Sequence, residues 1–173
     1  MLGDAPKRKV ERLGVEVMAE ENGNGGVDAA SPRFSVVAQY VKDFSFENPN
    51  APRSFGQQPA GLNLQVNVNG RQIAPTDYEV ELLLEGGAGE GPSIAFKFEL
   101  HYAGVFRIEN VPADQIQPLA MIEGPRLMFP FARQIIADAV RNGGYPPLYV
   151  DPIDFHRLYL QRLQATGAAP ANA

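Results

Sequence analysis

The feature that most constrains the fold is a change of hydrophobic period near the middle of the chain. Before it, apolar and polar residues alternate in four segments, and the segment LNLQVNVN (62–69) alternates at every position. A period of two predicts strands with one buried face. After it, apolar residues recur every three or four positions, which predicts helices. Strands first and helices second predict an α+β domain, a four-stranded antiparallel sheet with helices packed on one face.

The first predicted strand spans 33–48, and hairpin-length loops join the four predicted strands. On the first strand, one face collects the apolar side chains and is interrupted only by Lys42; that face carries Phe34, Val36, Ala38, Tyr40, Phe44 and Phe46. The pair Asn69-Gly70 predicts a hairpin turn after the second strand. The glycine-rich GGAGEGP (86–92) predicts the loop between the third and fourth strands, since it lacks the lysine and serine or threonine of a phosphate loop.

Three helices are predicted in the second half. A short one covers 113–121, and a main one runs from about 125 to 142, with Pro130 near its start. Proline removes one helical hydrogen bond and disfavours the helical conformation of the preceding residue, so we expect a bend there. The sequence Asp151-Pro-Ile-Asp154 predicts the start of the last helix, with Asp151 as N-cap and an end near 164.

Both ends have the composition of flexible segments. We expect a flexible N-terminal extension over 1–32, a folded domain over 33–164 and a flexible C-terminal tail over 165–173. No apolar stretch follows the basic residues near the N-terminus, so no secretory signal is expected. No apolar run reaches the roughly 20 residues of a membrane span, and direct membrane insertion is not expected.

Composition narrows the function. The chain has no cysteine and a net charge of −5. The absence of cysteine excludes disulfides and cysteine metal sites and agrees with a cytoplasmic location. The negative net charge argues against nucleic-acid binding, which needs a basic surface. The two histidines, His101 and His156, have no metal-ligand spacing, and no serine has a nucleophile motif. We therefore expect no enzymatic activity, no metal and no cofactor.

Apolar and acidic residues remain to be explained. The chain has 10 Phe and 6 Tyr, and one layer of helices leaves some of them uncovered, which predicts either a homo-oligomer interface or an apolar groove. The acids of the third predicted strand alternate with apolar residues. They are interpreted as a solvated face, with an acidic docking surface as the alternative; they are Glu79, Glu81 and Glu85.

Five stretches over 33–164 resemble the SecB family of bacterial protein-export chaperones. They are YVKDFSFENPNAP (40–52), DYEVELLL (77–84), GVFRI (104–108), PRLMFPFARQIIADAVRNGGYPPLYVDPIDF (125–155) and LYLQRLQ (158–164). The first and fourth together are the most specific. The resemblance implies a homotetramer, a dimer of dimers, that needs no nucleotide, keeps unfolded secretory precursor proteins from folding and delivers them to the SecA ATPase.

The resemblance also assigns two sets of residues. The substrate groove would be lined by Leu62, Leu64, Val66, Phe129, Phe131, Tyr159 and Leu163. The SecA docking face would contain Asp43, Glu47, Lys97 and Glu99. Lys97 departs from the family, which usually has an apolar residue there, and a cation is expected to weaken attraction to a basic partner. Two alternatives remain, a SecB-like chaperone that guards an antitoxin and a carrier of a small molecule or lipid.

Overall fold

The computed structural model describes residues 31–57 and 61–167. The expectations for 1–30 and 168–173 lie outside this part. Four strands form one antiparallel sheet, as predicted, and their order in it is β1-β4-β3-β2. The elements are β1 (Arg33–Glu47), β2 (Leu62–Gln72), β3 (Asp77–Ala88), the single 3₁₀ turn η1 (Gly91–Ser93), β4 (Phe96–Glu109), α1 (Ala113–Asn142) and α2 (Phe155–Thr166).

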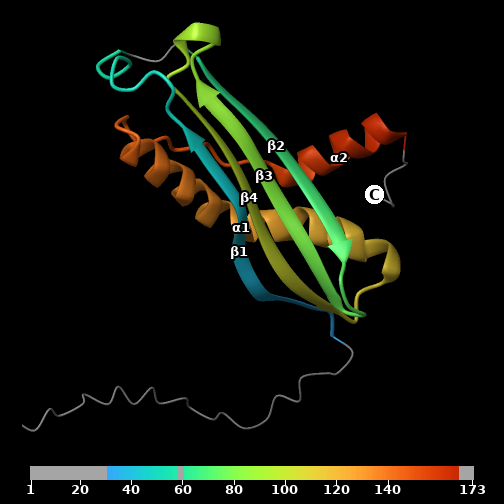
Figure 1. Ribbon diagram of the computed structural model, residues 1–173. Coiled ribbons are helices and arrows are strands. Elements are labelled where there is room, and N and C mark those ends of the chain that lie inside the picture. The colour runs from blue at the N-terminus through green and yellow to red at the C-terminus, as the bar shows by residue number, and fades with distance from the viewer. Residues whose placement is uncertain (1–30, 58–60, 168–173) are drawn as a thin grey trace, which may run out of the picture.

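Both helices lie behind the same face of the sheet (Figure 1). Alternate residues of the two central strands, β3 and β4, point toward α1 and are fully buried, among them Leu82, Leu84, Leu100 and Phe106. From α1, Met128, Ile136 and Val140 complete this core. Within the described residues, the opposite face of the sheet carries no helix.

The alternation predicted for β1 is wrong at Ala38 and Tyr40, because two bulges interrupt the pairing with β4; beyond the second bulge, Phe44 and Phe46 are back on the predicted face. The register shifts between Val36 and Ala38 and again between Val41 and Asp43. Each bulge places two residues opposite one and moves the following side chains to the other face. Tyr40 therefore lies on the open face, where its hydroxyl reaches Glu79, instead of on the helix side.

The two helices predicted over 113–142 are one continuous helix. Pro118, Pro125 and Pro130 all lie within α1. Each lacks an N–H, but the buried side chains of α1 bind the helix to the sheet along its length, and this packing outweighs the lost hydrogen bonds. α2 also begins later than expected. Its N-cap is Asp154, whose carboxylate accepts the Arg157 N–H at 2.9 Å, and Asp151 lies outside the helix.

The Asn69-Gly70 pair does not form a turn. Both residues are inside β2, opposite Glu81 and Val80, and the hairpin closes after Gln72. Gly70 has a packing role instead, since a Cβ there would lie 2.8 Å from the sulfur of Met121 on α1. The missing side chain lets α1 approach the edge of the sheet, beside the site described below.

The two most specific sequence stretches meet at one buried hydroxyl. Tyr145 Oη lies 2.6 Å from Ser54 Oγ and 3.0 Å from both Asn48 Oδ1 and the Ala95 carbonyl. The Asn48 amide also donates to the Gly143 carbonyl at 2.8 Å. These hydrogen bonds join the segment after β1 to the segment after α1, so both stretches have a structural function.

Candidate functional site

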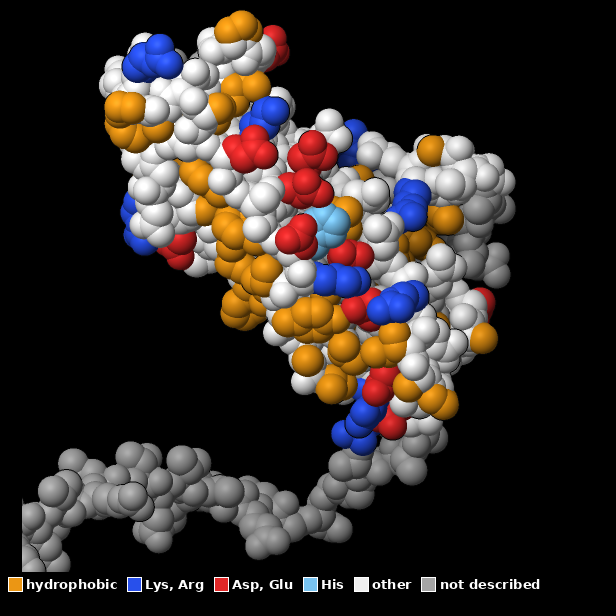
Figure 2. Space-filling view, in the orientation of Figure 1, with side chains coloured by type: hydrophobic (Ala, Val, Ile, Leu, Met, Phe, Trp, Pro, Cys, Tyr) orange, Lys and Arg blue, Asp and Glu red, His pale blue; other side chains and the backbone are white. Residues whose placement is uncertain are grey.

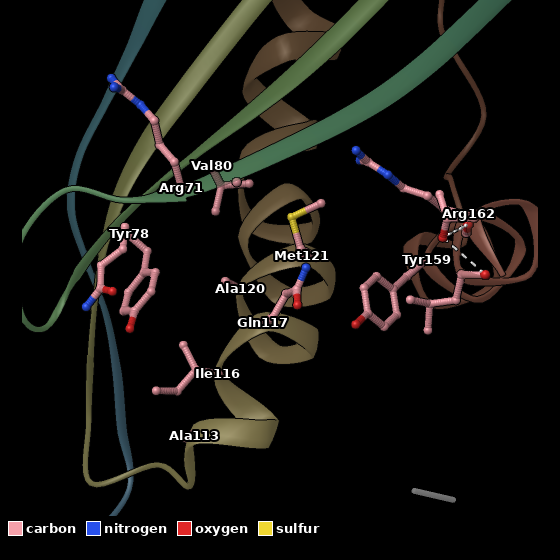
Figure 3. Close-up of a pocket in the computed structure, with 14 residues that line it drawn as sticks. Arg71, Tyr78, Val80, Ala113, Ile116, Gln117, Ala120, Met121, Tyr159 and Arg162 are labelled. Carbon is pink, nitrogen blue, oxygen red and sulfur yellow. Dashed lines mark hydrogen bonds between the residues drawn. The ribbon is translucent and has the colours of Figure 1, made fainter. Parts of the chain in front are cut away.

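The largest hollow on the helix side lies between the end of the β2–β3 hairpin, the first half of α1 and α2. Its volume is about 670 Å³, and we call it hollow 1. Figure 3 shows Tyr159 extending from α2 toward α1, while Ile116, Gln117 and Met121 come from α1. Its further lining residues are Gly70, Arg71, Gln72, Tyr78, Val80, Ala113, Ala120, Arg162, Leu163 and Thr166.

A second hollow of about 360 Å³, hollow 2, continues along the other side of α2. It is lined by Asn67, Val68, Met121, Phe155, Leu158, Tyr159, Gln161 and Arg162. Met121, Tyr159 and Arg162 border both hollows. Arg162 Nη1 donates a hydrogen bond to the Val68 carbonyl, which ties α2 to the edge strand β2. The two hollows are therefore the halves of one groove.

The chemistry of this groove suits extended polypeptide. No aspartate or glutamate lines either hollow among the described residues. Aromatic and aliphatic side chains supply most of the surface, and the arginine and glutamine side chains offer a few donors. Apolar surface with few polar groups binds side chains of many shapes, whereas a catalytic pocket needs convergent titratable groups.

The structure brings together only part of the predicted groove. Tyr159 and Leu163 line hollow 1. Phe129 is 6% exposed and packs edge-on against Phe155, so its ring belongs to the core beneath α2. Phe131 is 55% exposed on α1 and borders neither hollow. The remaining predicted residues share one face of β2, toward α1, but lie further along the strand; they are Leu62, Leu64 and Val66.

Sequence reasoning missed most residues of the groove, and four of them show why. Gly70 was assigned to a turn, and Tyr78 and Met121 have the ordinary spacing of core residues. Arg162 stands beside Leu163 on α2, but its partner is a backbone carbonyl 94 residues away, which no local pattern indicates. One sequence signal was available: a methionine on the helix, Met121, packs opposite a glycine on the edge strand, Gly70. Comparing helix and strand residues in pairs could have placed both at the groove.

The open face of the sheet is dominated by charge. Figure 2 views this face and shows acidic side chains gathered around one histidine, with basic side chains next to them. Glu79 accepts hydrogen bonds from Tyr40 Oη and Arg71 Nε, both at 2.5 Å. Lys42 Nζ lies 3.5 Å from Glu79 and 3.6 Å from Glu81. Glu79 is thus enclosed, at 6% exposure, and does not belong to a freely solvated row.

These contacts shift two pKa values in opposite directions. The hydrogen bond from Arg71, followed by that from Tyr40, lowers the pKa of Glu79 from 4.5 to about 2. His101 has a carboxylate 2.9 Å from each ring nitrogen, Glu99 at Nε2 and Glu81 at Nδ1. Both hydrogen bonds, that of Glu99 first, raise the pKa of the His101 imidazole. At the lower pH values His101 is therefore a cation held between two acids.

All four residues of the predicted docking set lie on this open face, at one end of it. Lys97 is paired with Glu47 across β4 and β1, and Asp43 is paired with His101. A shallow hollow of about 500 Å³ on the face contains Glu47, Lys97 and Glu99 and also two acids outside the predicted set, Glu85 and Glu90. The surroundings of Lys97 therefore remain acidic.

The outer edge strand β1 leaves large apolar side chains uncovered. Val36, Val37, Tyr40 and Val41 are all exposed. Clustered apolar side chains on an edge strand are rare on monomers and mark interaction surfaces. Surplus apolar surface, expected from the composition, is therefore concentrated on β1 as well as in the groove.

Within the described residues, no cluster of three or more His, Cys, Asp or Glu side chains has the arrangement of a metal site. No helix in the same ranges combines the length and the apolar character that crossing a membrane requires.

An open antiparallel sheet with both helices on one side and an apolar groove beneath the last helix places the chain among small α+β proteins with a binding groove. A SecB-like chaperone of Mycobacterium tuberculosis, solved in complex with a ChAD peptide from the HigA1 antitoxin, has this fold with a TM-score of 0.54. It is 13% identical, and the similarity covers 70% of this chain and 91% of that one.

The chain belongs to the SecB family, because the model of the preprotein translocase subunit SecB matches residues 27–166. The protein-export protein SecB of Methylocella silvestris is 58% identical over 153 residues, which are 87% of this chain and 95% of the relative. That of Xanthobacter autotrophicus is 57% identical over 152 residues, 87% of this chain and 97% of the relative. The family consists of chaperones and not of enzymes, as the sequence analysis expected.

Proposed function

We propose that this protein is an ATP-independent export chaperone that binds unfolded secretory precursors and delivers them to the SecA ATPase. One observation carries the proposal: the apolar groove and the acidic face lie on opposite sides of the same sheet. A client on the helix side leaves the open face free for a second partner. Relatives at 54–58% identity named as protein-export proteins support the same function.

Client recognition would depend on apolar contact along hollows 1 and 2, with weak sequence specificity. Tyr159 and Leu163 would form its centre. The exposed apolar side chain of Leu62, with Leu64 and Val66, would extend the binding surface along β2. Several weak contacts on one long unfolded chain raise the overall affinity, because each bound segment increases the local concentration of the next.

Docking to SecA would use Asp43, Glu47 and Glu99 on the open face, which attract a basic partner surface. Lys97 reduces this attraction, but Glu47 directly opposite and the nearby Glu85 and Glu90 maintain a local excess of negative charge. We therefore propose that docking persists in this chain although Lys97 departs from the usual apolar residue.

Assembly into a homotetramer in the cytoplasm completes the proposal. The exposed valines of β1 would be covered by a second subunit, since apolar side chains on an edge strand favour contact with another chain. A solution mass near four times 18.8 kDa supports this assembly, and a monomer at micromolar concentration contradicts it.

Client binding is tested by aggregation of a slow-folding precursor after dilution from denaturant, without nucleotide. The protein should suppress aggregation at one tetramer per precursor, and Tyr159→Ala should suppress it less. Gln164→Ala is the matched control, because Gln164 is exposed on the same helix and borders neither hollow. Undiminished aggregation with the wild-type protein would refute the holdase function.

Docking is tested by the affinity for SecA across a salt series. Glu99→Lys should weaken binding and flatten its salt dependence, while Lys97→Leu should strengthen binding. Opposite charges at a surface attract over about 8 Å at physiological salt, so the differences should shrink as salt increases. Glu109→Lys, on the same strand and face but at its far end, is the control. Equal affinities of Glu99→Lys and wild type would place docking elsewhere.

The second candidate, a chaperone that guards an antitoxin, is favoured by one observation. The M. tuberculosis neighbour with this fold was solved with an antitoxin peptide. A pull-down from cytosol distinguishes the two functions. Recovery of precursor proteins together with SecA would support export, whereas recovery of a single antitoxin without SecA would support the antitoxin function.

A further inference from the structure

The contact between Arg162 and Val68 closes the groove at its middle. Arg162 reaches from α2 to β2 (Figure 3), and its Nη1 donates to the Val68 carbonyl. Within the described residues, no carboxylate forms an ion pair with this guanidinium. Its hydrogen bond therefore goes to a neutral backbone group, and an incoming N–H can replace it without separating two charges.

The same carbonyl belongs to the free edge of the sheet. In an antiparallel strand, alternate residues direct both backbone groups toward the neighbouring strand or away from it. Because the Val68 carbonyl meets a side chain of α2, it points away from β3. Its N–H is occupied as well, by Asn67 Oδ1 at 2.9 Å. Val68 is thus capped on both backbone groups by side chains.

Val66 and Leu64 lie two and four residues before Val68 in β2. Their backbone groups therefore also point toward the free edge of the sheet. Among the described residues, no side chain caps either of them. An extended segment can therefore pair with β2 from Leu62 to Val66, but it meets the Arg162 contact at Val68. Pairing of this kind combines main-chain hydrogen bonds with apolar contacts of alternate side chains.

We propose that Arg162 is a latch that determines how long a client segment the groove accepts. Short segments bind on one side of the latch, whereas a segment that continues past Val68 displaces the guanidinium and donates its own N–H to the Val68 carbonyl. Hollows 1 and 2 then form one continuous groove. This inference rests on the proposed binding of unfolded clients, and it concerns selection by length at that same site.

The test compares two labelled, uncharged peptides of alternating Tyr or Leu and Ser, one of six residues and one of twelve. At roughly 3.3 Å per residue the shorter one covers about 20 Å and pairs with β2 without reaching Val68, while the longer one has to pass it. Fluorescence anisotropy measures the dissociation constant of each peptide for the full-length wild-type protein and for three variants.

Arg162→Met removes the donor and the charge but keeps an unbranched side chain of moderate length. Arg162→Lys retains a single donor, and Arg157→Met removes a cation from the same helix outside both hollows. We expect Arg162→Met to tighten binding of the twelve-residue peptide by about threefold to tenfold, the equivalent of one net hydrogen bond, and to leave the six-residue peptide unchanged. Arg162→Lys should fall in between, and Arg157→Met should match wild type.

Each outcome decides the proposal. An equal gain for both peptides would show a general loosening of α2, and a loss for the longer peptide would show that Arg162 itself holds clients; either overturns the latch. An unchanged ratio with both peptides bound also overturns it, and leaves the proposed function standing. Absence of binding by both peptides to all four proteins would overturn the client-binding function and the latch with it.

Discussion

Replacing Glu79 with glutamine should destabilise the protein although the side chain lies on the open face of the sheet. The carboxylate receives hydrogen bonds from Tyr40 and Arg71 and is close to Lys42. The lowering of its pKa from 4.5 to about 2 corresponds to at most about 3 kcal/mol of stabilisation. The side chains of Arg71 and Lys42 are 68% and 39% exposed, so solvent screens part of it. We expect a loss of about 1–2 kcal/mol at pH 7.

The stabilisation by Glu79 should depend on pH and should be lost at low pH. A carboxylate with a lowered folded-state pKa stabilises the protein fully above its unfolded value of 4.5, and this stabilisation is lost as the pH falls toward about 2. The difference in unfolding free energy between wild type and Glu79→Gln should therefore be constant above pH 5 and shrink below it.

Urea denaturation followed by circular dichroism measures the difference, at one fixed protein concentration because an oligomer is stabilised by mass action. Glu85→Gln, on the same strand and face but without an ion pair among the described residues, is the control and should change stability by less than about 0.5 kcal/mol. A Glu79→Gln protein as stable as wild type at pH 7, or a difference that persists unchanged to pH 3, would refute the assignment of Glu79 as an enclosed ion-pair centre.

Four further substitutions test three separate parts of the structure. Phe131→Ala should cause little loss of stability because its side chain is 55% exposed, whereas Phe129→Ala should cost about 3–5 kcal/mol in thermal denaturation; equal destabilisation by both would mean that Phe131 is also core. Tyr145→Phe should cost roughly 1–3 kcal/mol, since it leaves Ser54 and its neighbours without a hydrogen-bond partner, and an unchanged midpoint would contradict this. His101→Gln should be destabilising below pH 6.5 and approach wild type as the pH rises through the raised pKa of His101; a gap that widens with pH would contradict the two-carboxylate arrangement.

Local sequence was sufficient for the architecture, and the family resemblance for part of the groove. The alternation at 62–69 and along β3 and β4 predicted strands with one buried face, and the pairing β1-β4-β3-β2 keeps those faces toward the helices. These strand predictions succeed because a period of two specifies which side chains share a face, whatever the rest of the chain does. Tyr159 and Leu163 were assigned to the groove by the family resemblance, and both line hollow 1.

The features that the sequence did not predict are determined only by the tertiary structure, because each depends on a partner that is distant in sequence. A bulge against β4 before Ala38 turns Tyr40 to the open face, where Glu79, 39 residues away, becomes an enclosed carboxylate. Packing against the sheet carries α1 through three prolines, and the approach of Met121 converts an apparent turn glycine, Gly70, into part of a groove. The bond from Arg162 to the Val68 carbonyl has no sequence signal at all, since a backbone acceptor is present at every residue and only the folded chain selects one.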